Sequence, residues 1–223
     1  MTTIAIIGAG RGLGAATARR FGREGFTVAL ISRTQDNVDR LAAELAEHGV
    51  QTRGYAADVQ DRPTLAGALE RAASELGPIE VPQYSPVPRK DFLRPVLETT
   101  AADLVAAAEF SILGPVIAVQ QVLPGMRQLG RGTILFVNGS SAATPNVNVA
   151  GTSIAFAGES AYGAMLHEVL APKRIHVGQL IIPGAIGGGD PLYAPDALAD
   201  RIWNIHAQPG PFRTTAGHGG TVR

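Results

Sequence analysis

The sequence predicts an α/β fold in which a single domain is built on a doubly wound parallel sheet of the Rossmann type. Short runs rich in Ile and Val alternate with Ala-rich helical patterns along the chain. The runs are apolar throughout, as in strands buried on both faces of a sheet. No internal repeat or long linker divides the 223 residues, which are enough for one core. We therefore expect residues 1–223 to form one domain, with a loop or an edge strand from about residue 207.

The expected strands and helices follow one another in regular alternation. The expected strands are residues 3–7, 26–31, 52–56, 79–81, 133–137 and 175–182. The expected helices are residues 12–24, 36–48, 62–76, 100–129, 154–170 and 196–206. Pro115 lies inside the longest helical pattern and is expected to kink it. Right-handed crossovers between successive strands then place helices on both faces of the sheet.

Composition excludes several classes of function. The formal net charge is zero, which gives no electrostatic footprint for nucleic acid or an acidic membrane. The chain has no cysteine, and its five histidines show no close metal-ligand spacing. The first residues lack the basic region of a signal peptide, and the apolar stretches are shorter than the roughly 20 residues that span a bilayer. These observations favour a cytoplasmic protein that acts on a small molecule without a metal.

A glycine-rich loop follows the first expected strand directly. It reads GAGRGLG and contains Gly8, Gly10, Gly12 and Gly14, with Leu13 between the last two. Glycine permits a tight turn and close backbone approach, and the helix N-terminus offers free N–H groups and a positive dipole end. In this position between strand and helix, the motif predicts a site for the pyrophosphate of a dinucleotide.

The end of the second expected strand indicates which dinucleotide binds. Sites that prefer NAD carry an acidic residue here for the ribose 2′-hydroxyl, whereas this chain has Ser32 and Arg33. A guanidinium suits a 2′-phosphate by charge and by bidentate geometry. Arg11, inside the glycine loop, adds a second positive charge. We therefore expect NADP rather than NAD.

These features together resemble the short-chain dehydrogenase/reductase family over nearly the whole chain. The loop is similar to the family's TGxxxGxG, with Ile7 in place of the threonine, and QYSP stands in place of NNAG. The resemblance implies that members pair through their central and following helices, so a homo-oligomer is expected. It also implies further cofactor contacts, which are Asp58 and Val59 of ADVQD, Ser85 of QYSP, and Pro183, Gly184 and Ile186 of IIPGAI.

The catalytic residues that the resemblance implies are only partly present. The serine that ends the fifth strand is kept as Ser140, with Ser141 as a substitute. The family's Tyr-x-x-x-Lys pair, about 13 residues further on, falls on Ser153 and Ala157. The alternative assignment makes Tyr162 the acid, but nine residues carry it about 13 Å along the helix from Ser153, so it is expected to pack.

Two other side chains are considered as catalytic groups. Tyr84, at the end of the fourth strand, either donates a proton to a substrate oxygen beside Ser140 or only packs beside the cofactor. His206 lies in the region that closes over substrates in this family and is a weaker candidate.

Two functions follow from the sequence. The first is an NADP(H)-dependent oxidoreductase that reduces a carbonyl or related unsaturated group with an atypical proton donor. The second is a non-redox protein on the same scaffold, such as an isomerase, cyclase, lyase or cofactor-binding regulatory module that retains NADP.

Overall fold

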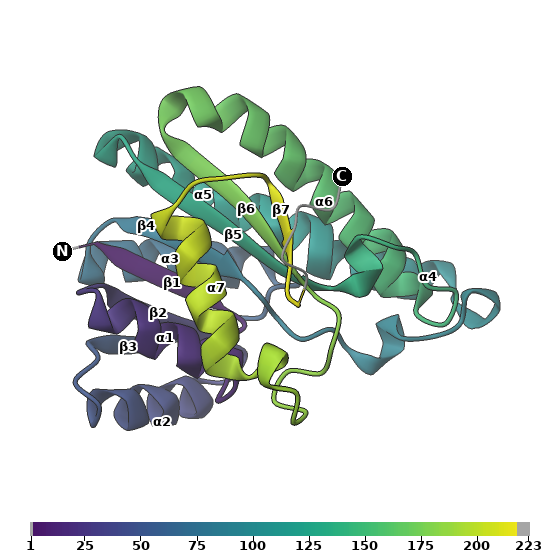
Figure 1. The fold of residues 1–223 in the computed structure, drawn as a ribbon, viewed down its shortest axis with the longest axis horizontal. Helices are drawn as coiled ribbons and strands as arrows, with labels where there is room; N and C mark the ends of the chain where they lie inside the picture. Colours follow the sequence, from purple (N-terminus) through teal and green to yellow (C-terminus); the bar gives the residue numbers. More distant parts are fainter. Residues whose placement is uncertain (1, 218–223) are drawn as a thin grey trace.

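The computed structural model describes residues 2–217, which form one parallel sheet with helices on both faces (Figure 1). The strand order is β3-β2-β1-β4-β5-β6-β7, and every neighbouring pair is parallel. The strands are β1 Thr3–Ile7, β2 Thr27–Ser32, β3 Thr52–Ala56, β4 Ile79–Tyr84, β5 Gly132–Gly139, β6 Ile175–Ile182 and β7 Arg213–Thr215. The predicted Rossmann-type fold is thus confirmed, and the tail supplies an edge strand as expected.

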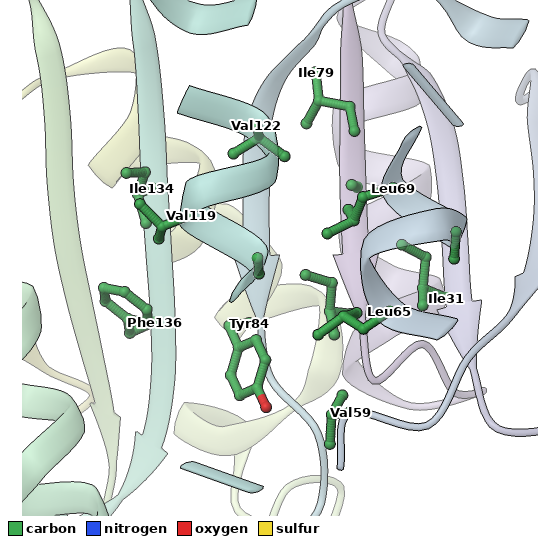
Figure 2. Packing of buried hydrophobic residues seen from close by; sticks show 14 of the residues in the cluster. Ile31, Val59, Leu65, Leu69, Ile79, Tyr84, Val119, Val122, Ile134 and Phe136 are labelled. Atoms are coloured by element: carbon green, nitrogen blue, oxygen red, sulfur yellow. The ribbon is translucent and has the colours of Figure 1, made fainter. Parts of the chain in front are cut away.

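The helices divide between the two faces of the sheet. Side chains from α1, α2 and α7 pack on one face around Phe21 and Leu30. Side chains from α3, α5 and α6 pack on the other face, where Leu65 of α3 and Val119 of α5 lie in one core with Phe136 of β5 (Figure 2). The helices are α1 Leu13–Arg23, α2 Gln35–Ala46, α3 Arg62–Leu76, α4 Ala101–Ala108, α5 Gly114–Leu129, α6 Ala150–Leu170 and α7 Pro195–Ala207.

The long central helix is interrupted at the place where the sequence predicts a kink. A five-residue π-helical segment, Glu109–Leu113, joins α4 to α5. Pro115 follows this segment as the second residue of α5, and its missing N–H removes one hydrogen-bond donor from the continuous helix. By length and composition, the run Ala101–Leu129 could cross a membrane, contrary to the expectation that no apolar stretch is long enough. A core helix passes the same test, and α5 packs against α3 and β4.

The helix α6 begins at Ala150, four residues earlier than predicted. Its small residues let it lie close to the rest of the chain. A Cβ atom on Gly151 would come within 2.9 Å of the Phe92 carbonyl oxygen, and one on Gly163 within 2.8 Å of the Phe212 ring. The glycines weaken the helical pattern of the sequence, but close packing inside the chain requires them.

Candidate functional site

Two adjoining cavities open at the carboxyl ends of the strands. Their volumes are about 720 and 560 Å³. Gly8, Gly10, Pro86 and Val87 line both, so the cavities meet at the glycine loop. Ligands bind outside the carboxyl ends of parallel strands in this architecture. We call the larger one the Arg33 cavity and the smaller one the Ser140 cavity.

The glycine loop is shaped by two close backbone approaches. Gly8 has φ of +91°, and a Cβ atom there would collide with Pro86. A Cβ on Gly14 would come within 3.0 Å of the Ala9 Cα, whereas Gly10 and Gly12 face open space. Together with the helix start at Leu13, this leaves a cradle of backbone N–H groups beside both cavities. The geometry fits a pyrophosphate.

The Arg33 cavity is lined by the residues predicted for the adenosine half of a dinucleotide. Its wall includes Ser32, Arg33, Asp58 and Val59. The Arg33 guanidinium is exposed and has no hydrogen-bond or ion-pair partner among the described residues. By contrast, Arg11 lines the cavity but pairs with Glu44 at 2.6 Å. Of these two arginines, Arg33 is therefore the one whose charge is free to bind a phosphate.

Sequence reasoning missed two residues of α2 in this wall. Asn37 and Arg40 line the Arg33 cavity, and an Arg40 Nη donates to Asn37 Oδ1 at 2.6 Å. They are three residues apart on α2, a spacing that places both side chains on one face of the helix. That spacing could have predicted that α2 turns them toward the same side.

The Ser140 cavity contains the other predicted cofactor contacts. Ser85, Pro183, Gly184 and Ile186 line it, as do Gly12, Leu13 and Gly14. The Ser85 N–H donates to the Ile7 carbonyl at 2.9 Å, which fixes the loop after β4 against β1. A Cβ atom on Gly184 would collide with the Tyr193 ring, so this turn is shaped by close packing.

The structure separates the two predicted catalytic residues. Ser140 begins a short 3-10 helix after β5, is exposed, and lines the cavity. Its hydroxyl has no hydrogen-bond partner among the described side chains and backbone groups. Tyr84 instead is buried in the core (Figure 2). Its hydroxyl donates to the Phe110 carbonyl oxygen. Burial raises the pKa of this phenol, and Tyr84 lines neither cavity, so the structure favours the packing alternative over proton donation.

The residues that α6 turns toward the cavity differ by one from those expected. Thr152 and Phe156 line the Ser140 cavity. Ser153 is buried, and its hydroxyl is held by Asn146 and Val149 at 2.9–3.1 Å. Ala157 is exposed. Residues i and i+4 share a helix face, so the pair that occupies the cavity wall is Thr152 and Phe156, not Ser153 and Ala157.

The Thr152 hydroxyl is engaged within the protein. It donates to the Val149 carbonyl at 3.1 Å and accepts from the Ser141 hydroxyl at 3.4 Å. Thirteen residues before Thr152 lies Gly139 rather than Ser140. Counting from Ser140 therefore gave the one-residue error in α6.

Two further candidates lie away from both cavities. Tyr162 is half-buried against the core, as the sequence predicts. His206 contacts the Thr133 hydroxyl at 2.9 Å and packs against Phe21 and Trp203. Thr133 is at the start of β5, the end of the sheet opposite the cavities, so the prediction for His206 is corrected.

Behind the Ser140 cavity lies a buried polar network that the sequence did not indicate. Asn138 lines the cavity, and its Nδ2 donates to Glu159 Oε2 at 2.9 Å. Gln179 Nε2 donates to Asn138 Oδ1 and to the Ser160 hydroxyl, each at 2.8 Å. Burial raises the pKa of Glu159 to about 8, so the carboxyl is mainly protonated at neutral pH.

With this geometry in view, comparison with known proteins assigns the family. The model of the short chain dehydrogenase family matches residues 2–189. The chain belongs to this family, whose members are oxidoreductases.

One curated relative and two solved structures show the extent of the similarity. Dehydrogenase/reductase SDR family member 4 from Homo sapiens is 26% identical over 175 residues, which are 78% of this chain. The match spans 62% of that relative, less than two thirds of its length.

The two structures share the fold across nearly the full length of both chains. A metagenomic short-chain oxidoreductase in complex with NADP has a TM-score of 0.84 at 20% identity, covering 96% of each chain. A short chain oxidoreductase from Pseudomonas aeruginosa PAO1, described as containing an atypical catalytic center, has a TM-score of 0.85 at 17% identity. That match covers 100% of this chain and 98% of the other.

Proposed function

We propose that the chain is an NADP(H)-dependent oxidoreductase that reduces a carbonyl or a related unsaturated group. The observation that carries this proposal is the pair of cavities joined at the glycine loop. Every residue predicted to bind the cofactor lines one cavity or the other. When bound, the cofactor supplies a hydride, and the PG turn at Pro183 and Gly184 forms part of the wall at the reacting end.

The preference for NADP rests on Arg33. Its guanidinium follows β2 directly, lines the adenosine cavity and has no partner in the described chain. A charge-assisted bidentate hydrogen bond to phosphate is about twice as strong as a neutral one. Ser32 and the nearby Arg40 add a hydroxyl and a second guanidinium to the same wall. The metagenomic relative with the same fold was solved in complex with NADP.

We further propose that this member works without the Tyr-x-x-x-Lys pair. None of the four tyrosines has a lysine four residues later. The two lysines, Lys90 and Lys173, lie in short 3-10 helices outside α6. Thr152 and Phe156 of α6 line the cavity wall where we expect the tyrosine and lysine of that pair in other members. In this proposal the free hydroxyl of Ser140 holds the reacting group of the substrate.

The chemistry of the Ser140 cavity favours reduction over the non-redox alternative. An isomerase, cyclase or lyase moves protons and needs an acid or a base with a suitable pKa. Among residues 2–217, those that line this cavity are glycine, proline, aliphatic, phenylalanine, serine, threonine and asparagine residues. A bound hydride donor needs none of these groups to ionise.

Binding and turnover test this function separately. The chain is titrated with NADPH by fluorescence and is then mixed with NADPH and a panel of ketones, aldehydes and imines, while loss of reduced-cofactor absorbance is followed. Tight NADPH binding and saturable oxidation by at least one acceptor are expected. Tight binding with no oxidation across the panel would leave the non-redox alternative in place.

We also propose that the chain forms a homo-oligomer and is located in the cytoplasm. Val105 on α4 and Ile154, Met165 and Val169 on α6 are apolar side chains that are 52–63% exposed. A second copy of the chain packed on these helices would bury them. Size-exclusion chromatography with light scattering tests this, because a single copy at all concentrations is incompatible with it.

A further inference from the structure

The Ser140 cavity poses a charge problem for the reduction of a neutral ketone. Hydride transfer from a neutral donor to a neutral carbonyl creates an alkoxide and a cation within one pocket. A proton donor normally removes this separation, and general acid catalysis is worth about 10²–10⁴-fold. In a pocket of low dielectric, uncompensated charges are costly.

The described groups in the cavity wall offer little acid to solve this problem. The Thr152 hydroxyl is committed to the Val149 carbonyl, and the Ser141 hydroxyl to Thr152. The Asn138 amide is held by Glu159 and Gln179. Among the hydroxyl groups that the structure describes in this wall, only that of Ser140 is free, and an alcohol without an adjacent base is a weak acid. The wall can orient a substrate, but it has no group that would readily protonate the alkoxide formed from a ketone.

Phe156 adds a second property to this wall. It is 6% exposed, packs against Ala142 and Ile181, and lines the cavity. An aromatic ring attracts a cation, whereas an ammonium at this position would repel one. The mouth of the cavity is also apolar, because Val87, Leu93 and Ile186 line it and are 85%, 46% and 44% exposed.

From these observations we infer that the preferred substrate is an apolar iminium cation, a C=N⁺ group carried on a hydrophobic ring. This inference rests on the proposed function and narrows its substrate class. The iminium carbon takes the hydride with its electron pair from a C–H bond of the reduced cofactor, which breaks as the new C–H bond forms, and the C=N π electrons become the nitrogen lone pair. The products are a neutral amine and oxidised NADP⁺. One positive charge is present before and after, and no proton is gained or lost.

A matched pair of substrates tests the inference. The chain is given NADPH and either 1,2-dimethyl-3,4-dihydroisoquinolinium, which carries a permanent cation, or 1-tetralone, a bicyclic ketone of similar shape. We expect the iminium to be reduced at least about 100-fold faster, the scale of a general acid contribution. We also expect an unequal mixture of product enantiomers, which distinguishes reaction in the cavity from reaction in free solution. The kcat for reduction of the iminium should not depend on pH between 6 and 9.

Binding provides a readout independent of turnover. Calorimetry measures the Kd of each probe for the cofactor-free chain and for two variants, Phe156→Lys and Phe156→Met. The ammonium of F156K should weaken iminium binding at least tenfold while changing tetralone binding less than threefold. F156M controls for loss of the ring shape, and thermal melts establish that both variants are folded.

The outcomes separate the inference from the proposed function. If tetralone is reduced as fast as the iminium, or if the rate falls with rising pH as an acid titrates, the inference is overturned and the NADP(H)-dependent reductase stands. Equal effects of F156K on the two probes also overturn it. If NADPH binds but neither probe nor any member of the wider panel is reduced, the proposed function itself fails.

Discussion

Asn138 Nδ2 donates to Glu159 Oε2 at 2.9 Å inside the core, and this bond joins the wall of the Ser140 cavity to helix α6. The second carboxyl oxygen, Oε1, is buried without a hydrogen-bond partner among the described residues. An ionised carboxylate in that position would be poorly solvated. The network therefore holds Asn138 in place with a neutral acid.

Glu159→Gln should make the protein less sensitive to alkaline pH. The folded-state pKa of Glu159 is raised from 4.5 to about 8, so its contribution to stability is full below about pH 4.5 and is lost as pH rises to about 8. Glutamine keeps the oxygen that accepts from Asn138 but cannot ionise. At pH 9 the variant should melt at least about 4 °C above the parent.

The control for Glu159 is Glu168→Gln, because Glu168 lies on the same helix and is exposed. Its melting temperature should follow that of the parent at every pH. If the parent and E159Q lose stability in parallel between pH 5 and pH 9, Glu159 is ionised in the folded state.

Arg33→Ala should weaken NADPH binding much more than NADH binding. Loss of a charge-assisted contact costs about 1.5–3 kcal/mol, or roughly 10–100-fold in Kd. Arg11→Ala provides the comparison, because Arg11 is already paired with Glu44 and should change the NADPH Kd less than about fivefold. Fluorescence titration with both cofactors measures this, and equal losses for NADPH and NADH would refute the assignment.

Tyr84→Phe should lower stability and leave turnover unchanged. Its hydroxyl donates to the buried Phe110 carbonyl, and loss of that donor costs about 1–3 kcal/mol. Ser140→Ala is the opposite case and should reduce kcat with little change in the melting temperature, because the Ser140 hydroxyl is exposed in the cavity. A large fall in kcat for Y84F, at a temperature where it is folded, would return Tyr84 to the reaction.

Gly8→Ala should cost more stability than Gly25→Ala. Both glycines have positive φ, +91° and +85°, so both substitutions incur a backbone penalty of roughly 1–2 kcal/mol. Only the Gly8 Cβ also meets Pro86, whereas Gly25 faces open space. Urea denaturation measures the difference. Equal destabilisation would mean that the loop after β4 can move away from the glycine loop.

The lining of the Arg33 cavity, and much of that of the Ser140 cavity, was predictable because these residues are close to strand ends in the sequence. Apolar runs fix the strands, and parallel strands bring their carboxyl ends to one edge. The glycine loop and the segments after β2, β3 and β6 then meet there without knowledge of any side-chain contact. Asn37 and Arg40 were missed although their three-residue spacing on one helix is visible in the sequence.

By contrast, the sequence could not predict which side chains of α6 line the Ser140 cavity. Whether Thr152 or Ser153 faces the cavity depends on where α6 starts and on its rotation, and one residue turns a helix by about 100°. The small residues at its start give a weak helical pattern, so the sequence placed that start too late. Likewise, only the packing of α5 shows that the Tyr84 hydroxyl points to Phe110 and not to Ser140.

The sequence by itself determined the parallel Rossmann-type sheet, the glycine loop at its edge and the presence of an arginine directly after β2, because these depend on local patterns and on chain order. Only the tertiary structure decided which side chains line the Ser140 cavity, that Tyr84 is buried, and that a protonated Glu159 supports Asn138. Those features depend on the rotation of helices and on burial, which contacts between distant segments set.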